Sequence, residues 1–249
     1  MKRKNAWGTV KVLIGILVLW QLLAMVLHIA FIPTPLAVLM NIFNIFFTRI
    51  ALHLLLSLWR IFAGLAASVL IGVPLGLCMG YFPAWNRHLS PLVYFTYPIP
   101  KIALLPLVML IFGLSEFSKI FMIMLIVVFQ VTVSMRDAVK AIPKETFYSM
   151  VSLGARRRDI FKLVVFPASL PTLFSSVRVS LGTALSVLFF TETFGTQYGL
   201  GYFIMDSWMR INYVDMFSGI LILGMLGLLL FGLVDLLERR VCRWKAARD

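Results

Sequence analysis

Long apolar runs alternate with short basic segments along this chain, and that alternation constrains its fold more than any other feature. Lipid offers no hydrogen-bond partners to a backbone, so a chain crosses a bilayer as helices or as a closed barrel. A spanning helix needs about 20 residues. Six runs approach or exceed that length, two of them interrupted by a single cation: residues 12–32, 61–85, 89–112, 120–135, about 168–190 and 216–234. We therefore predict an all-α integral membrane protein of about six transmembrane helices, forming a single domain over residues 1–249.

Composition excludes an ordinary soluble protein. Hydrophobic residues make up 61% of the chain and charged residues 13%, whereas soluble domains average about 45–50% and about 25%. The net charge of +13 could suggest nucleic acid, but the basic residues lie between the apolar runs, as they do in cytoplasmic loops. We expect a lipid bilayer, and no nucleic acid, as a partner.

The first apolar run indicates a retained span. It is too long for a signal peptide, and no small-residue cleavage pattern follows it. Pro33 and Pro35 end this run. The mixed segment 36–58, which contains Arg49 and His53, suits a helix lying in the outer interface.

The distribution of Lys and Arg predicts the orientation. With six spans and a cytoplasmic N-terminus, 17 of the 23 Lys and Arg fall on the inner side. Four fall on the outer side, namely Arg49, Arg60, Lys119 and Arg210, while Lys101 and Arg178 lie at membrane depth. Basic residues concentrate on the cytoplasmic side of membrane proteins. Both termini are therefore expected in the cytoplasm, in a bacterial-type inner membrane.

Glycines recur every four residues in the second run, at Gly72, Gly76 and Gly80. That spacing leaves one helix face smooth enough for a neighbouring helix to pack closely. The alternative is the generally raised glycine content of membrane helices.

Residues 136–166 form the one long polar stretch inside the apolar body. Pro143 is typical of a helix start, apolar residues follow at near-helical spacing, and Gly154 and Ala155 interrupt them. We predict a short amphipathic helix, a glycine turn and a second short helix that ends at Pro167. Such an insert fits either a groove on a soluble protein or an interface with anionic lipids.

The sequence YSMVSLGARRRDIFKLVVFP resembles the cytoplasmic "EAA" loop of ABC importer permeases. Gly154, Ala155 and Pro167 stand at the family's offsets, while Tyr148, Ser149 and Met150 replace its Glu-Ala-Ala. Residues 98–120 and 189–204 are similar to segments of the nitrate/sulfonate/taurine-type subfamily. The resemblance covers about residues 50–235.

This resemblance implies an importer in which two permease subunits, identical or related, form the pathway. Two cytoplasmic ATPase subunits would hydrolyse ATP, and an external binding protein would deliver a small solute, such as a sulfonate, taurine, nitrate or bicarbonate. The loop would transmit movement of the ATPase in an alternating-access cycle. The implied coupling residues are Glu145, Tyr148, Ser149, Leu153, Gly154, Ala155, Arg156, Arg157 and Arg158.

The sequence itself shows no phosphate-binding G-x-x-x-x-G-K-[ST] motif, no nucleophile–base pair and no metal-ligand spacing. We therefore expect a transport subunit with no catalytic residues, no metal and no cofactor of its own. A stand-alone secondary transporter and a membrane receptor or scaffold for a cytoplasmic partner are the alternatives.

Several residues within the apolar runs are candidates for the pathway or its gate. An ionisable group at membrane depth costs about 2.5–3.5 kcal/mol, so Lys101 and Arg178 either line a path for an anion, reach an interface or pair with a carboxylate. Prolines in the third run indicate either a broken helix or a kinked packing helix, and Glu192 either a gate or a helix cap. The candidates are Pro98, Pro100, Lys101, Pro106, Arg178 and Glu192.

Overall fold

The computed structural model describes residues 4–27, 31–96 and 98–244. Every regular element in this described part of the chain is helical. The chain falls into two compact units, one formed by residues 1–56 and 196–224 and the other by residues 57–195 and 225–249. Helices α3 (Ala51–Tyr81) and α11 (Tyr213–Val241) each contribute to both units.

The first unit contains three further helices and a π-helical turn. These elements are α1 (Lys4–Leu27), α2 (Pro35–Ile45), the π turn Phe46–Ile50 and α10 (Leu200–Met209). Thr34 caps α2, because its hydroxyl accepts a hydrogen bond from the Ala37 amide at 3.3 Å. Asp215, near the start of α11, accepts hydrogen bonds from Asn41 at 2.8 Å and Arg49 at 2.7 Å.

The π turn joins α2 to α3 without a break in the helical backbone. The predicted boundary between an outer helix at 36–58 and a span beginning at Ile61 is therefore wrong, since α3 begins at Ala51 and ends at Tyr81. Arg49 and His53 do not interrupt the helical segment, because each side chain has a polar partner inside the first unit. Arg49 pairs with Asp215, and the His53 ring lies 3.0 Å from the backbone of Gly199.

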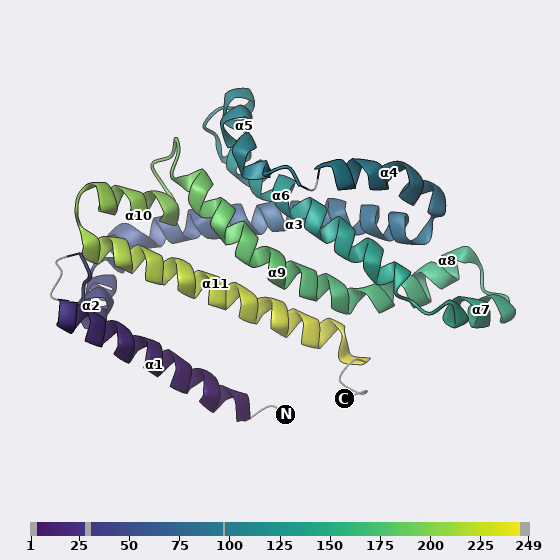
Figure 1. Ribbon diagram of the computed structural model, residues 1–249, viewed down its shortest axis with the longest axis horizontal. Helices are drawn as coiled ribbons and strands as arrows, with labels where there is room; N and C mark the ends of the chain where they lie inside the picture. The colour runs from purple at the N-terminus through teal and green to yellow at the C-terminus, as the bar shows by residue number, and fades with distance from the viewer. Residues whose placement is uncertain (1–3, 28–30, 97, 245–249) are drawn as a thin grey trace. The chain divides into compact units, whose positions relative to one another are not determined.

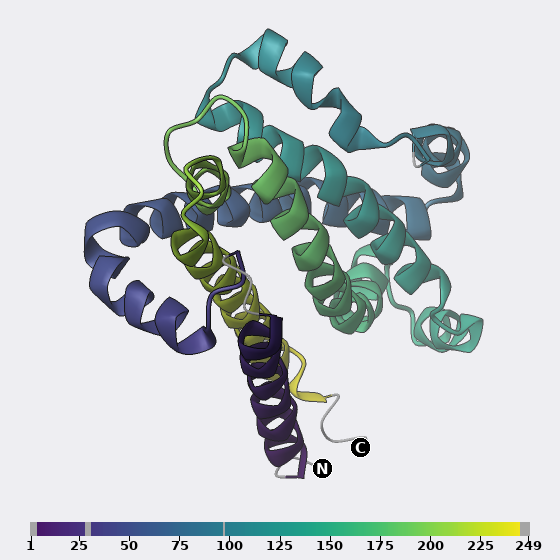
Figure 2. The ribbon, with the colours of Figure 1, turned by 60° about the vertical axis from the view of Figure 1, so that its left-hand side comes forward.

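The second unit is built around α6 (Glu116–Lys140) and α9 (Phe166–Glu192), which run side by side (Figures 1 and 2). Ser115 caps α6, since its hydroxyl accepts a hydrogen bond from the Ser118 amide. The remaining elements are α4 (Pro83–Thr96), the 3₁₀ turn Lys101–Leu104, α5 (Leu105–Phe112), α7 (Lys144–Ser152), α8 (Arg157–Ile160) and the π turn Phe161–Val165.

The glycine face predicted on the second apolar run packs against α6. A Cβ atom added to Gly76 would lie 2.5 Å from the Met135 Cβ, and one added to Gly80 would lie 2.5 Å from the Val139 Cβ. A Cβ atom added to Gly72 would likewise lie 3.0 Å from the Val131 Cβ. The helices come this close because the glycines have no side chains, so the packing interpretation is confirmed.

Within the described residues, four continuous helical segments are long and apolar enough to cross a membrane: Pro35–Tyr81, Glu116–Lys140, Arg157–Glu192 and Tyr213–Val241. Pro83–Thr96 and Lys101–Phe112 form a pair bent by 80° that would make a fifth span, and Ile14–Val26 is a shorter apolar helix. The all-α membrane architecture is thus confirmed. The number of six crossings stays a prediction.

Candidate coupling surface and polar cavity

The polar insert folds as a helix, a turn and a second helical segment, as predicted (Figure 1). The prediction that this second helix ends at Pro167 is wrong, because it continues through the π turn Phe161–Val165 into α9 and ends at Glu192. Pro167 lies in the first turn of α9, where proline is tolerated. The turn is a Schellman motif, in which the Ala155 amide donates to the Met150 carbonyl at 3.0 Å and the Gly154 amide to the Val151 carbonyl at 2.9 Å. Gly154 has a φ of +76°, and an added Cβ would meet no described atom within 4 Å. Glycine is therefore favoured here by the backbone conformation and not by lack of space.

One side of α7 presents apolar side chains that nothing in the described chain covers. Tyr148 is 66% exposed, Val151 61% and Leu153, just past the helix end, 82%. None of the nine residues of α7, all of which the structure describes, is buried. We call Tyr148, Val151 and Leu153 the coupling surface. Exposed apolar side chains in a polar, basic segment are candidates for contact with a partner.

Polar residues of the insert stabilise its two short helices. Glu145 lies in the first turn of α7, where its negative charge stabilises the helix by interacting with the positive end of the helix dipole. The Ser149 hydroxyl donates to the Glu145 carbonyl at 2.9 Å. Asp159 accepts a hydrogen bond from the Arg156 amide at 3.0 Å and so caps α8. Arg157 and Arg158 border an apolar hollow of about 310 Å³ that includes Tyr81 and Phe161.

Pro98 and Pro100 lie at a break between α4 and the 3₁₀ turn, and the helices on either side are bent by 80°. Pro106 lies in the first turn of α5, where a missing N–H breaks no helical bond. The third apolar run is thus a broken helix and not one kinked helix. The break places Lys101 at the start of the 3₁₀ turn.

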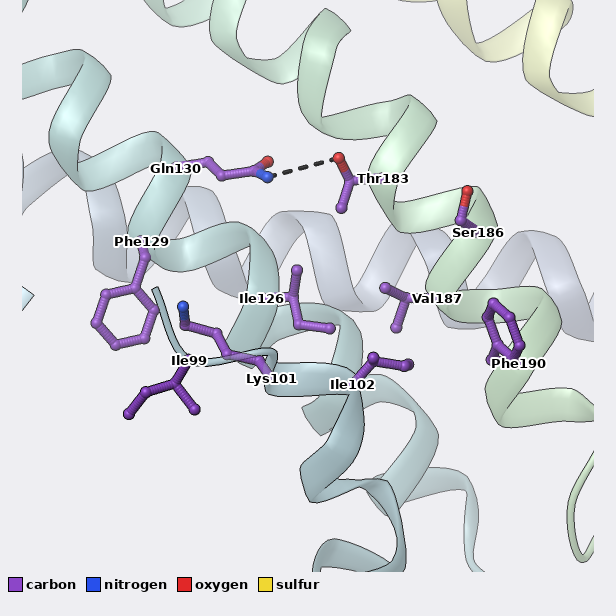
Figure 3. Close-up of a pocket in the computed structure, with 10 residues that line it drawn as sticks. All are labelled: Ile99, Lys101, Ile102, Ile126, Phe129, Gln130, Thr183, Ser186, Val187 and Phe190. Atoms are coloured by element: carbon purple, nitrogen blue, oxygen red, sulfur yellow. Dashed lines mark hydrogen bonds between the residues drawn. The ribbon is translucent and has the colours of Figure 1, made fainter. Parts of the chain in front are cut away.

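Lys101 borders a cavity of about 400 Å³ between the 3₁₀ turn, α6 and α9 (Figure 3). Its Nζ donates to the Thr96 carbonyl at 2.9 Å and lies 4.7 Å from the centre of the Phe129 ring. Across the cavity, the Gln130 Nε2 donates to the Thr183 Oγ1 over a long 3.5 Å. The cavity is lined by Ile99, Lys101, Ile102, Ile126, Phe129, Gln130, Thr183, Ser186, Val187 and Phe190.

Arg178 does not border this cavity. Its guanidinium is paired with two carboxylates of α11, at 2.6 Å from the Asp235 Oδ1 and 2.6 Å from the Glu238 Oε2. Of the three alternatives weighed for Arg178, the structure shows the carboxylate pair.

Glu192 is the last residue of α9, is 0% exposed and forms part of a buried ionic network. Its Oε1 lies 2.7 Å from the Arg60 Nη1, and the Ser57 hydroxyl donates to the same carboxylate at 2.8 Å. Arg60 also contacts Glu116 at 2.6 Å, and Lys119 lies 3.6 Å from Glu116. We call these five residues the α3–α6–α9 ionic network.

The sequence analysis missed this network by assigning Arg60 and Lys119 to outer segments. Both side chains are buried within helices, at 0% and 1% exposure. The available signal was the charge of Glu192, because an acidic residue at the end of an apolar run needs a cationic partner. Arg60 and Lys119 each border an apolar run and were candidates for that partner.

Comparison with known proteins identifies related membrane components. The family model described as binding-protein-dependent transport system inner membrane component matches residues 69–243. The taurine transport system permease protein TauC of Escherichia coli (strain K12) is 32% identical over 77% of this chain and 70% of its own length. The formylaminopyrimidine transport permease protein ThiX of Halalkalibacterium halodurans is 30% identical over 92% of each chain.

A third relative and one solved structure extend this comparison. The putative aliphatic sulfonates transport permease protein SsuC of Bacillus subtilis (strain 168) is 28% identical over 92% of this chain and 84% of its own length. An inward-facing structure of the MetNI methionine ABC transporter contains a chain of similar fold. The TM-score is 0.67 at 21% identity, over 76% of this chain and 94% of that one.

Proposed function

The chain belongs to the family of binding-protein-dependent transport system inner membrane components, and from this premise we propose that it forms half of the pathway of an ATP-driven importer for a small anion. Both compact units would then belong to one permease. A second permease subunit, a cytoplasmic ATPase dimer and an external binding protein would complete the assembly. ATP would be hydrolysed by the ATPase partners.

The coupling surface is the observation that carries this proposal. Its apolar side chains project from a short helix inside a basic segment, and the described chain leaves them exposed. A hydrophobic knob with a basic rim suits a groove on a soluble subunit, in which apolar burial supplies the affinity. We propose that this subunit is the ATPase and that Glu145, Ser149, Gly154, Ala155 and the following arginines position the knob.

Binding of the coupling surface to the ATPase would let the ATPase switch the spans between inward-open and outward-open arrangements. Closure of an ATP-bound dimer would pull α7 and thereby favour one arrangement of the spans over the other. A ligand shifts a conformational equilibrium only by its differential affinity for the two states, so ATP must favour one arrangement by several kcal/mol. The rigid Schellman turn at Gly154 would transmit that difference from α7 to α8 and α9.

The names of three relatives support an anionic solute, whereas ThiX is named for formylaminopyrimidine. Taurine and aliphatic sulfonates carry sulfonate groups, and another relative is named a bicarbonate transport system permease protein. That protein, CmpB of Synechococcus elongatus, is 29% identical over 75% of this chain and 68% of its own length. Lys101 at the cavity and the inner-membrane location stated for the family agree with this proposal.

Recovery of the ATPase with the affinity-tagged chain tests the proposal. Leu153→Asp would place a charge in the buried contact and is expected to lower the recovered ATPase by about tenfold or more, since that corresponds to about 1.4 kcal/mol of lost affinity. Leu153→Met is the matched control and should retain the partner. Equal recovery with Leu153→Asp would contradict the coupling assignment, and solute uptake without any ATPase would favour a secondary transporter.

A further inference from the structure

The cavity beside Lys101 combines charge, hydrogen-bonding groups and an apolar wall in one open hollow (Figure 3). We infer that this cavity is a transient solute site, which binds the anionic group of the solute at Lys101, Gln130 and Thr183. We infer further that the solute is an organic anion with a short apolar body. This inference rests on the proposed function, because it names the solute class for that same pathway.

The polar side of the cavity has spare capacity for a ligand. Gln130 Oε1 is buried and has no hydrogen-bond partner among the described residues. The amide's bond to Thr183 is long, at 3.5 Å, and is therefore weak and readily exchanged for an anion oxygen. Rotation of the amide would present its NH₂ group to the cavity. Together with the Lys101 ammonium and the Thr183 hydroxyl, it supplies donors of the kind that stabilise an oxyanion.

The wall between Lys101 and the Gln130–Thr183 pair is apolar and disfavours strongly hydrated ions. Ile102, Ile126, Val187 and Phe190 line it, and Figure 3 shows these side chains grouped away from Gln130. Burying an alkyl chain there would contribute about 25 cal/mol per Å². An inorganic dianion such as sulfate would lose bound water there, and the apolar side chains offer no hydrogen bonds to replace it. A short alkylsulfonate or carboxylate fits both the polar and the apolar parts of the cavity.

A second hollow of about 350 Å³ continues along α6 and α9, and Gln130 borders it as well. Hydroxyl groups line this hollow, at Ser134, Thr172, Ser175, Ser176 and Ser180. Ser180 is 1% exposed, and its hydroxyl has no partner among the described residues. The α9 residues recur at three- or four-residue intervals, which places them on one helix face. The two hollows share Gln130, and we call them together the α6–α9 track, in which hydroxyl groups beyond Gln130 interrupt a mainly apolar lining.

Such a track suits passage, because a pathway site must bind firmly enough to admit the solute and weakly enough to release it. The charged group would be held at Lys101 and then pass to neutral hydroxyls beyond Gln130. Arg178 is unsuited to this role since it is already paired with Asp235 and Glu238.

Direct binding to the intact permease–ATPase complex in nanodiscs tests the inference, with ³⁵S-labelled butanesulfonate as the probe. The wild-type complex is expected to bind it saturably, with competition from unlabelled butanesulfonate and little from sulfate. Lys101→Met and Gln130→Leu should each weaken binding by about tenfold or more, because each removes one donor to the anion. Lys101→Arg keeps the charge and should weaken binding less than Lys101→Met does, although the guanidinium differs in shape from the ammonium.

Lys11→Met removes an exposed cation of α1 and is the matched control that should leave binding unchanged. Absence of saturable binding, equal competition by sulfate, or unchanged binding in Lys101→Met and Gln130→Leu would each overturn the inference. If the ATPase fails to copurify with the wild-type chain, the proposed function itself fails. If the complex assembles and hydrolyses ATP while both variants bind the probe normally, only the inference fails.

Discussion

At the residue scale, the pairing of Arg60 with Glu192 is the most consequential contact in the second unit. Their side chains are 1% and 0% exposed, and the joining atoms lie 2.7 Å apart. Removing one member of a buried pair costs about 3–5 kcal/mol when the other charge is left unpaired. Without Glu192, Arg60 would still pair with the half-exposed Glu116, so the cost here should be about 3 kcal/mol or less. We expect Glu192→Ala to lower the free energy of unfolding of the solubilised protein by that order, as measured by denaturant titration.

Two further variants separate this electrostatic effect from lost packing. Asp206→Asn removes the partner of Arg210, whose side chain is 64% exposed, and should change the stability by less than about 1 kcal/mol. The double variant Arg60→Met with Glu192→Leu removes both buried charges and should recover most of the loss. A double variant less stable than Glu192→Ala would contradict this account of the network.

Sequence analysis could single out charged residues at this scale but not their partners. Lys101 and Glu192 were recognisable because they stand in or beside apolar runs, and Lys101 borders a cavity. Arg60 was misplaced because it lies at the edge of a run, and its pairing with Glu192 joins residues 132 positions apart. Contacts of that separation depend on helix packing, which local patterns do not encode.

At the element scale, the approach of α3 to α6 depends on glycine. Gly76→Ala would place its Cβ 2.5 Å from the Thr132 carbonyl oxygen and the Met135 Cβ, so the helices must separate. Overpacking of this kind costs about 1–3 kcal/mol, and we expect a corresponding fall in thermal stability. Gly182→Ala in α9 meets no described atom within 4 Å and is the matched control. Equal stability of the two variants would argue against close packing.

The turn after α7 gives a functional prediction at the same scale. In Gly154→Val, the added Cβ would meet no neighbouring atom, but the backbone would be strained. A β-branched residue rarely adopts a φ of +76°. We expect this variant to lose most ATP-driven uptake while remaining in the membrane. Gly154→Asn should retain more uptake, because asparagine tolerates the left-handed conformation. Wild-type assembly and uptake with Gly154→Val would exclude the turn as the transmitting element.

The elements themselves were predicted unevenly. The first helix and the turn of the insert follow from Pro143 and Gly154, which are strong local signals. Pro167 misled the prediction, because the second helix runs through it into α9. The broken third run was one of two alternatives, since its prolines fit either. The continuous join of α2 to α3 was missed because a π turn has no simple sequence signature.

At the scale of the whole molecule, the orientation in the membrane is a prediction from charge. Single cysteines introduced at Arg158 and Arg210, in a background lacking Cys78 and Cys242, would test it by labelling with a membrane-impermeant maleimide. Arg158→Cys should react only from the cytoplasmic side and Arg210→Cys only from the outside, because basic residues concentrate inside. Labelling of both positions from one side would overturn the predicted orientation.

The assembled importer is the central claim of this account, and the coupling surface is its structural basis. Native mass spectrometry of the affinity-tagged chain, extracted gently from its own membrane, tests the claim most directly. The account predicts a complex of two permease subunits with two ATPase subunits, held through Tyr148, Val151 and Leu153. Recovery of the chain only by itself or with other copies of itself, without an ATPase, would contradict it.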